Sequence, residues 1–151
     1  MPHSILWSLV LALHLISIIF WVGGGAYAVV VLRPSLGLLD ATQRNSVHLQ
    51  TMARFFKGLT HAIPTALITG WLMIFHEGGF ANVPWTTNLM QLAGILMALL
   101  FARLYFGAYQ KARRAIRPQA SVFDSIRTQV LVIVALGMLA VLAASLGHPF
   151  V

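Results

Sequence analysis

Apolar residues form four long runs along the chain, and short polar segments separate them. The runs cover roughly residues 5–32, 55–75, 87–109 and 123–146. An α-helix of about 20 mostly apolar residues crosses the hydrocarbon core of a bilayer. The pattern therefore predicts four transmembrane helices.

Proline positions agree with these boundaries, because proline disfavours the interior of a helix. The apolar runs are followed or preceded by Pro34, Pro84, Pro118 and Pro149, which all lie outside them. Pro64 falls inside the second run. We expect it to bend that helix and to free a carbonyl group near Thr60.

Composition supports a membrane protein. Of the 151 residues, 59% are hydrophobic and only 9% are charged, whereas soluble domains have about 25% charged residues. The length fits one domain that spans residues 1–151. The chain has no cysteine, which excludes disulfides, thiolate metal sites and c-type haem attachment.

The positions of the basic residues predict the topology. All ten Lys and Arg residues lie within residues 33–57 or 103–127, and the segment 76–86 and both tails have none. Under the positive-inside rule, the basic loops are cytoplasmic and both termini lie on the outer, periplasmic side. We expect an all-α, antiparallel four-helix bundle, multi-pass in a bacterial inner membrane. The basic residues thus indicate contact with the lipid bilayer rather than with nucleic acid.

His14 is a titratable residue inside the first apolar run. Such residues are costly in a membrane helix and usually have a function. Ser17, Trp21 and Gly24 follow it at helical spacing. We interpret this stripe as one wall of a buried site, where Trp21 either stacks on a planar ligand or simply packs and Gly24 leaves room for a ligand or a helix.

His61 is a second histidine within the predicted spans. Counting from the helix ends, its depth differs from that of His14 by roughly 7–8 Å. If tilt closes that gap, the two imidazoles could ligate one haem iron or a bare metal ion. The alternative is that each forms a hydrogen bond within the bundle, and the sequence leaves open whether they reach one depth.

Three further histidines lie near the predicted outer surface: His3, His76 and His148. With Glu77 they could bind copper or zinc, or they could be merely solvated. His3 and His76 also lie on roughly the same helical faces as His14 and His61, so the number of haems, one or two, stays open. Arg103, near the cytoplasmic end of the third span, could pair with a haem propionate or extend its side chain to the interface.

Short motifs resemble two related membrane families. The start of the copper-resistance protein D (CopD) domain is similar to this chain at His14, Trp21, the glycines that follow it, Arg33 and Pro34, and its second helix at Arg54, Phe55, Thr69 and Gly70. HemJ-type proteins are similar at Ala12, Leu13, His14, Trp21, Gly24, Arg54 and Pro64. The resemblance covers most of the four spans.

The resemblance implies two different functions. CopD-like proteins are associated with copper passage across the inner membrane. HemJ-like proteins bind haem and act in protoporphyrinogen oxidation, and their important first-helix histidine corresponds to His14. A lysine common at the start of their third helix is replaced here by Gln91, which argues against the HemJ reaction, and His61 is an addition.

The sequence thus predicts a haem b protein with a redox or electron-transfer role, with His14 and His61 as axial ligands. If it is an enzyme, we expect a membrane oxidoreductase. The alternatives are copper binding and transport, or a structural subunit of a larger complex. Expected partners are a redox protein or quinone, and a second copy of the chain or other membrane subunits.

Overall fold

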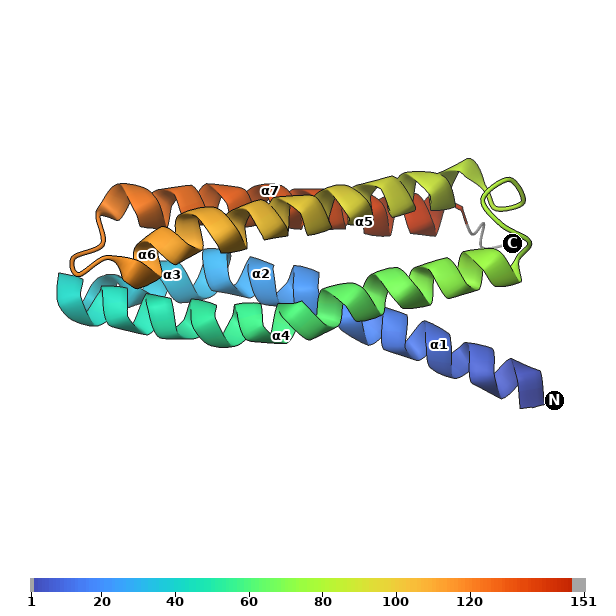
Figure 1. Ribbon diagram of the computed structural model, residues 1–151, viewed down its shortest axis with the longest axis horizontal. Helices are drawn as coiled ribbons and strands as arrows, with labels where there is room; N and C mark the ends of the chain where they lie inside the picture. Colours follow the sequence, from blue (N-terminus) through green and yellow to red (C-terminus); the bar gives the residue numbers. More distant parts are fainter. Residues whose placement is uncertain (1, 148–151) are drawn as a thin grey trace.

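The computed structural model describes residues 2–147, and the side chains from Ser4 onward. This part of the chain is helical throughout, apart from short connections (Figure 1). The first rod comprises α1 (Pro2–Ile18), η1 (Ile19–Gly23), α2 (Gly24–Tyr27), η2 (Ala28–Leu32), α3 (Arg33–Ser35) and η3 (Leu36–Leu38). The others are α4 (Ala41–His76), then α5 (Trp85–Leu104) with η4 (Tyr105–Tyr109) and α6 (Gln110–Arg114), then α7 (Ala120–Leu146).

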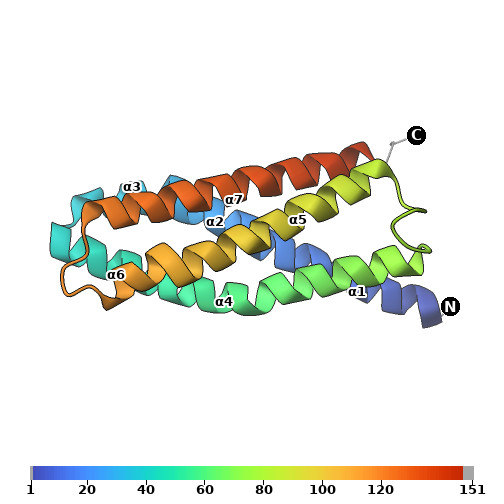
Figure 2. The ribbon, with the colours of Figure 1, turned by 45° about the horizontal axis from the view of Figure 1, so that its top comes forward.

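The all-α prediction is confirmed for residues 2–147, which contain four helices long and apolar enough to cross a membrane. Successive rods run in opposite directions (Figure 1). α1 packs along α4, α5 packs along α7, and α2 lies against α7. The connections at 36–40 and 115–119 lie at one end, which we call the basic end, and the loop at 77–84 lies at the other (Figure 2).

Helix boundaries extend beyond the apolar runs, most clearly in α4. This helix begins at Ala41 rather than near residue 55. Asp40 caps it, because its Oδ1 accepts a hydrogen bond from the Gln43 N–H at 2.8 Å. At about 1.5 Å per residue its 36 residues measure about 54 Å, well beyond a hydrocarbon core of about 30 Å. Helical structure continues through Pro64.

The apolar core lies mainly in the half of the bundle nearest the basic end. Its most deeply buried large side chains are Trp21, Phe56, Met52, Met97, Leu104 and Ile126. The Phe56 ring meets Phe101 and Tyr109 edge to face, with ring centroids 5.4 and 4.9 Å apart. Aromatic pairs of this geometry add to the stabilisation from burial.

The outward surface of the rods is apolar as well. Exposed large hydrophobic residues occur on every rod, for example Ile16, Ile68, Leu99 and Leu139. Soluble monomers rarely expose such extensive apolar surface. Such a surface is suited to contact with the hydrocarbon chains of a lipid bilayer.

Two π-helical turns, η1 and η2, interrupt the first rod. Single π turns inside α-helices often occur at functional sites. Between them, Gly24 lies so close to Phe55 that a Cβ atom would overlap the Phe55 ring. The space over Gly24 is thus taken by an aromatic side chain from α4, which fits the close-packing role that the sequence left open for this glycine beside a ligand-binding role.

Candidate functional site

His14 points from α1 toward α4, where two oxygen atoms meet its ring. Its Nδ1 lies 2.8 Å from the Ala66 carbonyl oxygen and 3.1 Å from Thr69 Oγ1. A carbonyl oxygen can only accept a hydrogen bond, so Nδ1 must be the protonated nitrogen. In the neutral imidazole, the lone pair available to a ligand is therefore on Nε2.

Thr69 supports the same tautomer. Its hydroxyl is within hydrogen-bond distance of two carbonyl oxygens of its own helix, those of Thr65 at 2.5 Å and Ala66 at 3.2 Å. Because the hydroxyl donates to one of these, its oxygen is free to accept from His14. Histidines that bind metals typically donate their other ring N–H to such a partner, which fixes the orientation of the ring.

Gly70 and Gln91 complete the surroundings of the imidazole. A Cβ atom placed on Gly70 would lie 3.1 Å from His14 Cε1 and 3.7 Å from Gln91 Oε1, so both side chains adjoin this glycine. Gln91 belongs to α5 and is buried, and its Nε2 has no hydrogen-bond partner among the described residues. We call the group formed by His14, the Ala66 carbonyl, Thr69, Gly70 and Gln91 the His14 site.

The rest of the predicted stripe faces the interior. Ser17 is buried, and its hydroxyl donates to the Leu13 carbonyl one turn earlier. Trp21 is only 2% exposed, and within the described part of the chain its indole N–H has no acceptor. Buried N–H groups of this kind are normally paired with protein, water or ligand.

His61 does not reach the His14 site. Its side chain is exposed, and its Nδ1 lies 3.1 Å from the Lys57 carbonyl and 3.3 Å from Thr60 Oγ1 on its own helix. It precedes Ala66 by five positions, which is about 7.5 Å along the axis and about 140° around it. The expected sharing of one iron by His14 and His61 therefore has no support in this geometry.

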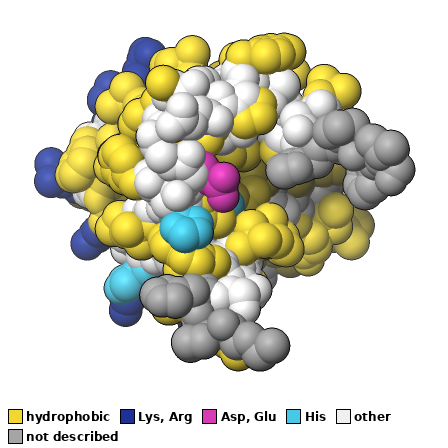
Figure 3. All heavy atoms as spheres, turned by 90° about the vertical axis from the view of Figure 1, so that its right-hand side faces the viewer, with side chains coloured by type: hydrophobic (Ala, Val, Ile, Leu, Met, Phe, Trp, Pro, Cys, Tyr) yellow, Lys and Arg dark blue, Asp and Glu magenta, His cyan; other side chains and the backbone are white. Residues whose placement is uncertain are grey.

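The predicted outer histidines do not form a cluster in the described structure. His76 is exposed and stacks on Trp7, with ring centroids 3.8 Å apart and planes 21° apart. The His3 side chain and the whole of His148 lie outside the described residues. Among the residues described, no group of three His, Cys, Asp or Glu side chains could hold a metal ion. Figure 3 views this end of the molecule and shows mainly apolar surface with small acidic and histidine patches.

Arg103 is also distant from the His14 site. It is exposed in the last turn of α5. It follows Gln91 by twelve positions, or about 18 Å along the helix. The structure therefore does not place Arg103 beside a ligand bound at His14.

No protein-family model, no curated protein and no solved structure matches this chain. The similarity to CopD and HemJ proteins therefore stays a hypothesis based on short motifs. The fold defines an all-helical protein with four helices of membrane-spanning length in its described part. The site defines a histidine of fixed tautomer beside a buried, unpaired amide group.

Proposed function

We propose that this protein is an integral membrane haem b protein with a redox or electron-transfer role, in which His14 supplies an axial ligand. The main observation is the contact between His14 Nδ1 and the Ala66 carbonyl. It leaves the Nε2 lone pair for a metal, and an imidazole nitrogen is a common axial ligand of haem iron. A bound haem would supply a one-electron redox couple.

The surrounding donors fit a ligand with polar groups. An unpaired buried N–H group costs about 1–3 kcal/mol, so the Gln91 amide favours an acceptor beside it. The unpaired indole N–H of Trp21 gives the first rod a second buried donor. In this proposal His14 would hold the iron, and the Ala66 carbonyl and Thr69 hydroxyl would keep its ring in place.

The proposed location is a bacterial inner membrane, with both termini on the periplasmic side. The support is the distribution of the ten basic residues, which lie within residues 33–57 and 103–127. The His14 site then lies in the outer half of the bundle, because Gln91 is close to the start of α5 and Gly70 is close to the end of α4.

An absorption spectrum of the purified protein, with quantification of porphyrin and copper, tests this proposal. We expect a Soret band, α and β bands on reduction, and haem in stoichiometric amount. A colourless protein produced with ample haem supply would contradict the proposal. Stoichiometric copper without porphyrin would instead favour copper handling, and neither cofactor would favour a structural subunit.

A further inference from the structure

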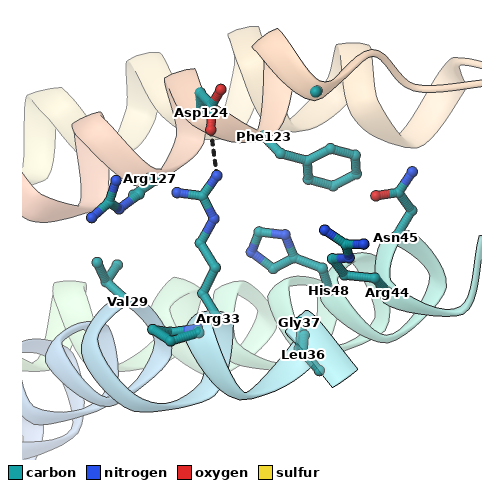
Figure 4. A pocket seen from close by; sticks show the side chains of 12 residues that line it. Val29, Arg33, Leu36, Gly37, Arg44, Asn45, His48, Phe123, Asp124 and Arg127 are labelled. Carbon is teal, nitrogen blue, oxygen red and sulfur yellow. Dashed lines mark hydrogen bonds and ion pairs between the residues drawn. The ribbon is translucent and has the colours of Figure 1, made fainter. Parts of the chain in front are cut away.

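A separate pocket lies at the basic end of the bundle, far along the first rod from His14. It has a volume of about 480 Å³ and is lined by η2, α3 and η3, the start of α4 and the start of α7. Figure 4 shows the side chains that line it. Its walls include the apolar residues Val29, Leu36 and Phe123, all of them buried.

The charged residues of this pocket are mostly positive. Arg33, Arg44 and Arg127 line it, with Asp124 as the acidic residue. Arg33 reaches across from α3 to form an ion pair with Asp124 of α7 (Figure 4). Among the described residues, Arg44 and Arg127 have no carboxylate partner, although Arg44 Nη2 donates a hydrogen bond to the Leu39 carbonyl oxygen at 3.4 Å. Three positive charges of the lining thus face one negative charge.

Two uncharged polar side chains of α4 complete the lining: His48 and Asn45. His48 is only 6% exposed, and its ring stacks on Phe123 with centroids 5.1 Å apart. Neither ring nitrogen of His48 forms a hydrogen bond with another described residue. A buried imidazole, whose nitrogens have no hydrogen-bond partner among the described residues, therefore borders the same space as the arginines.

We propose that this pocket binds a phosphate group, which an anionic phospholipid or free phosphate would supply. Guanidinium groups present several N–H donors in a planar fork that matches phosphate oxygens. Basic pockets between transmembrane helices on the cytoplasmic side are suited to lipid headgroups. The apolar wall formed by Val29, Leu36 and Phe123 suits the glycerol and acyl part of such a lipid. This inference is independent of the haem proposal.

The test uses the full-length protein in a neutral detergent. Bound dioleoyl-phosphatidylglycerol and dioleoyl-phosphatidylcholine are counted by native mass spectrometry, and inorganic phosphate is titrated by calorimetry and as a competitor. The pocket variant is R44Q/R127Q, in which both substituted side chains are exposed, so folding should be kept. The matched control is R114Q/R117Q, which removes two arginines from the same end outside the pocket.

We expect phosphatidylglycerol to bind more tightly than phosphatidylcholine, and the pocket variant to lose roughly 25-fold in affinity, at about fivefold per arginine. The control variant should lose less than about threefold. Displacement of the lipid by millimolar phosphate would identify free phosphate as the ligand, and its failure would identify the lipid. Equal losses in the two variants, or no loss in the pocket variant, would overturn the proposal.

Discussion

A single main-chain carbonyl, that of Ala66, determines which nitrogen of His14 is available to a ligand. The 2.8 Å contact requires a proton on Nδ1, and Thr69 accepts from the same N–H. Thr69 and Gln91 are polar residues within apolar helices, and this pattern marks them in the sequence as candidate site residues. Their proximity to His14 could not be predicted, because the rotation of one helix against another is set by tertiary packing.

Gly70 gives the most local test of this arrangement. In Gly70→Ala the new Cβ would lie 3.1 Å from His14 Cε1, so the imidazole must shift and its bond to Ala66 should weaken. Perturbing the partners that orient a metal-binding histidine typically costs 10–100-fold in affinity. We therefore expect about a tenfold loss of haem affinity, measured by titration of apoprotein with haem.

Gly94→Ala is the matched control, because its Cβ would meet only Leu67, at an ordinary 3.9 Å. Its haem affinity should stay within about twofold of the wild type, since a helix tolerates alanine well. Equal losses in the two variants would mean that the His14 ring is not held as the structure places it.

At the scale of helices, α4 shows why apolar runs and helix lengths differ. The run that begins near residue 55 marks where lipid contact is favourable, whereas the helix itself begins at its cap, Asp40. An Asp accepting from the third residue of a helix is a recognisable N-cap. The Asp40 cap could therefore be recognised in the sequence, but the hydropathy pattern alone does not locate the start of α4.

Removing this cap should affect the start of α4. Asp40→Ala is expected to cost about 1 kcal/mol, because the Gln43 N–H loses its acceptor. Hydrogen exchange should then accelerate in the first turns of α4 and not near Gly70. Asp124→Ala is the control, since it removes an exposed ion pair worth about 0–1 kcal/mol and should leave those amides unchanged. Unchanged exchange in Asp40→Ala would contradict the assigned cap.

The rotation of α4 against α1 explains why the predicted pairing of His14 with His61 is not seen in the structure. The ends of an apolar run define the depth of a residue in the membrane, but they give no information about which face of α4 meets α1. Residues Ala66, Thr69 and Gly70 form the face that meets His14, while His61 lies about 140° around the helix from Ala66 and about five residues nearer the basic end. The number and type of the helices were therefore predictable, but the contacts between their faces were not.

For the whole molecule, the large apolar core and most of the buried polar residues lie in different halves of the bundle. The large core side chains Phe56, Leu104 and Ile126 fill the half near the basic end. Gln91 and Thr86, which are buried and have unpaired polar atoms, lie in the other half near the start of α5, whereas the buried His48 lies at the basic end. The proposed haem site thus lies in the less apolar half, and the proposed phosphate pocket lies at the opposite end.

The orientation of the bundle can be tested with single cysteines, because the chain has none of its own. Ala81→Cys places a thiol in the loop at 77–84, and Ser121→Cys places one at the start of α7, both at exposed positions. The positive-inside rule predicts that a membrane-impermeant maleimide labels the first in intact cells and the second only after lysis. The reverse pattern would invert the proposed topology.

The most direct test of the central claim compares haem content in three purified proteins: the wild type, His14→Ala and His61→Ala. His61 is the matched control, since it is an exposed histidine bonded only to its own helix. Absorption spectra with a haem-to-protein ratio should show full occupancy in the wild type and in His61→Ala, and little or no haem in His14→Ala. Haem retained in His14→Ala, or lost equally in both variants, would contradict the assignment of His14 as the axial ligand.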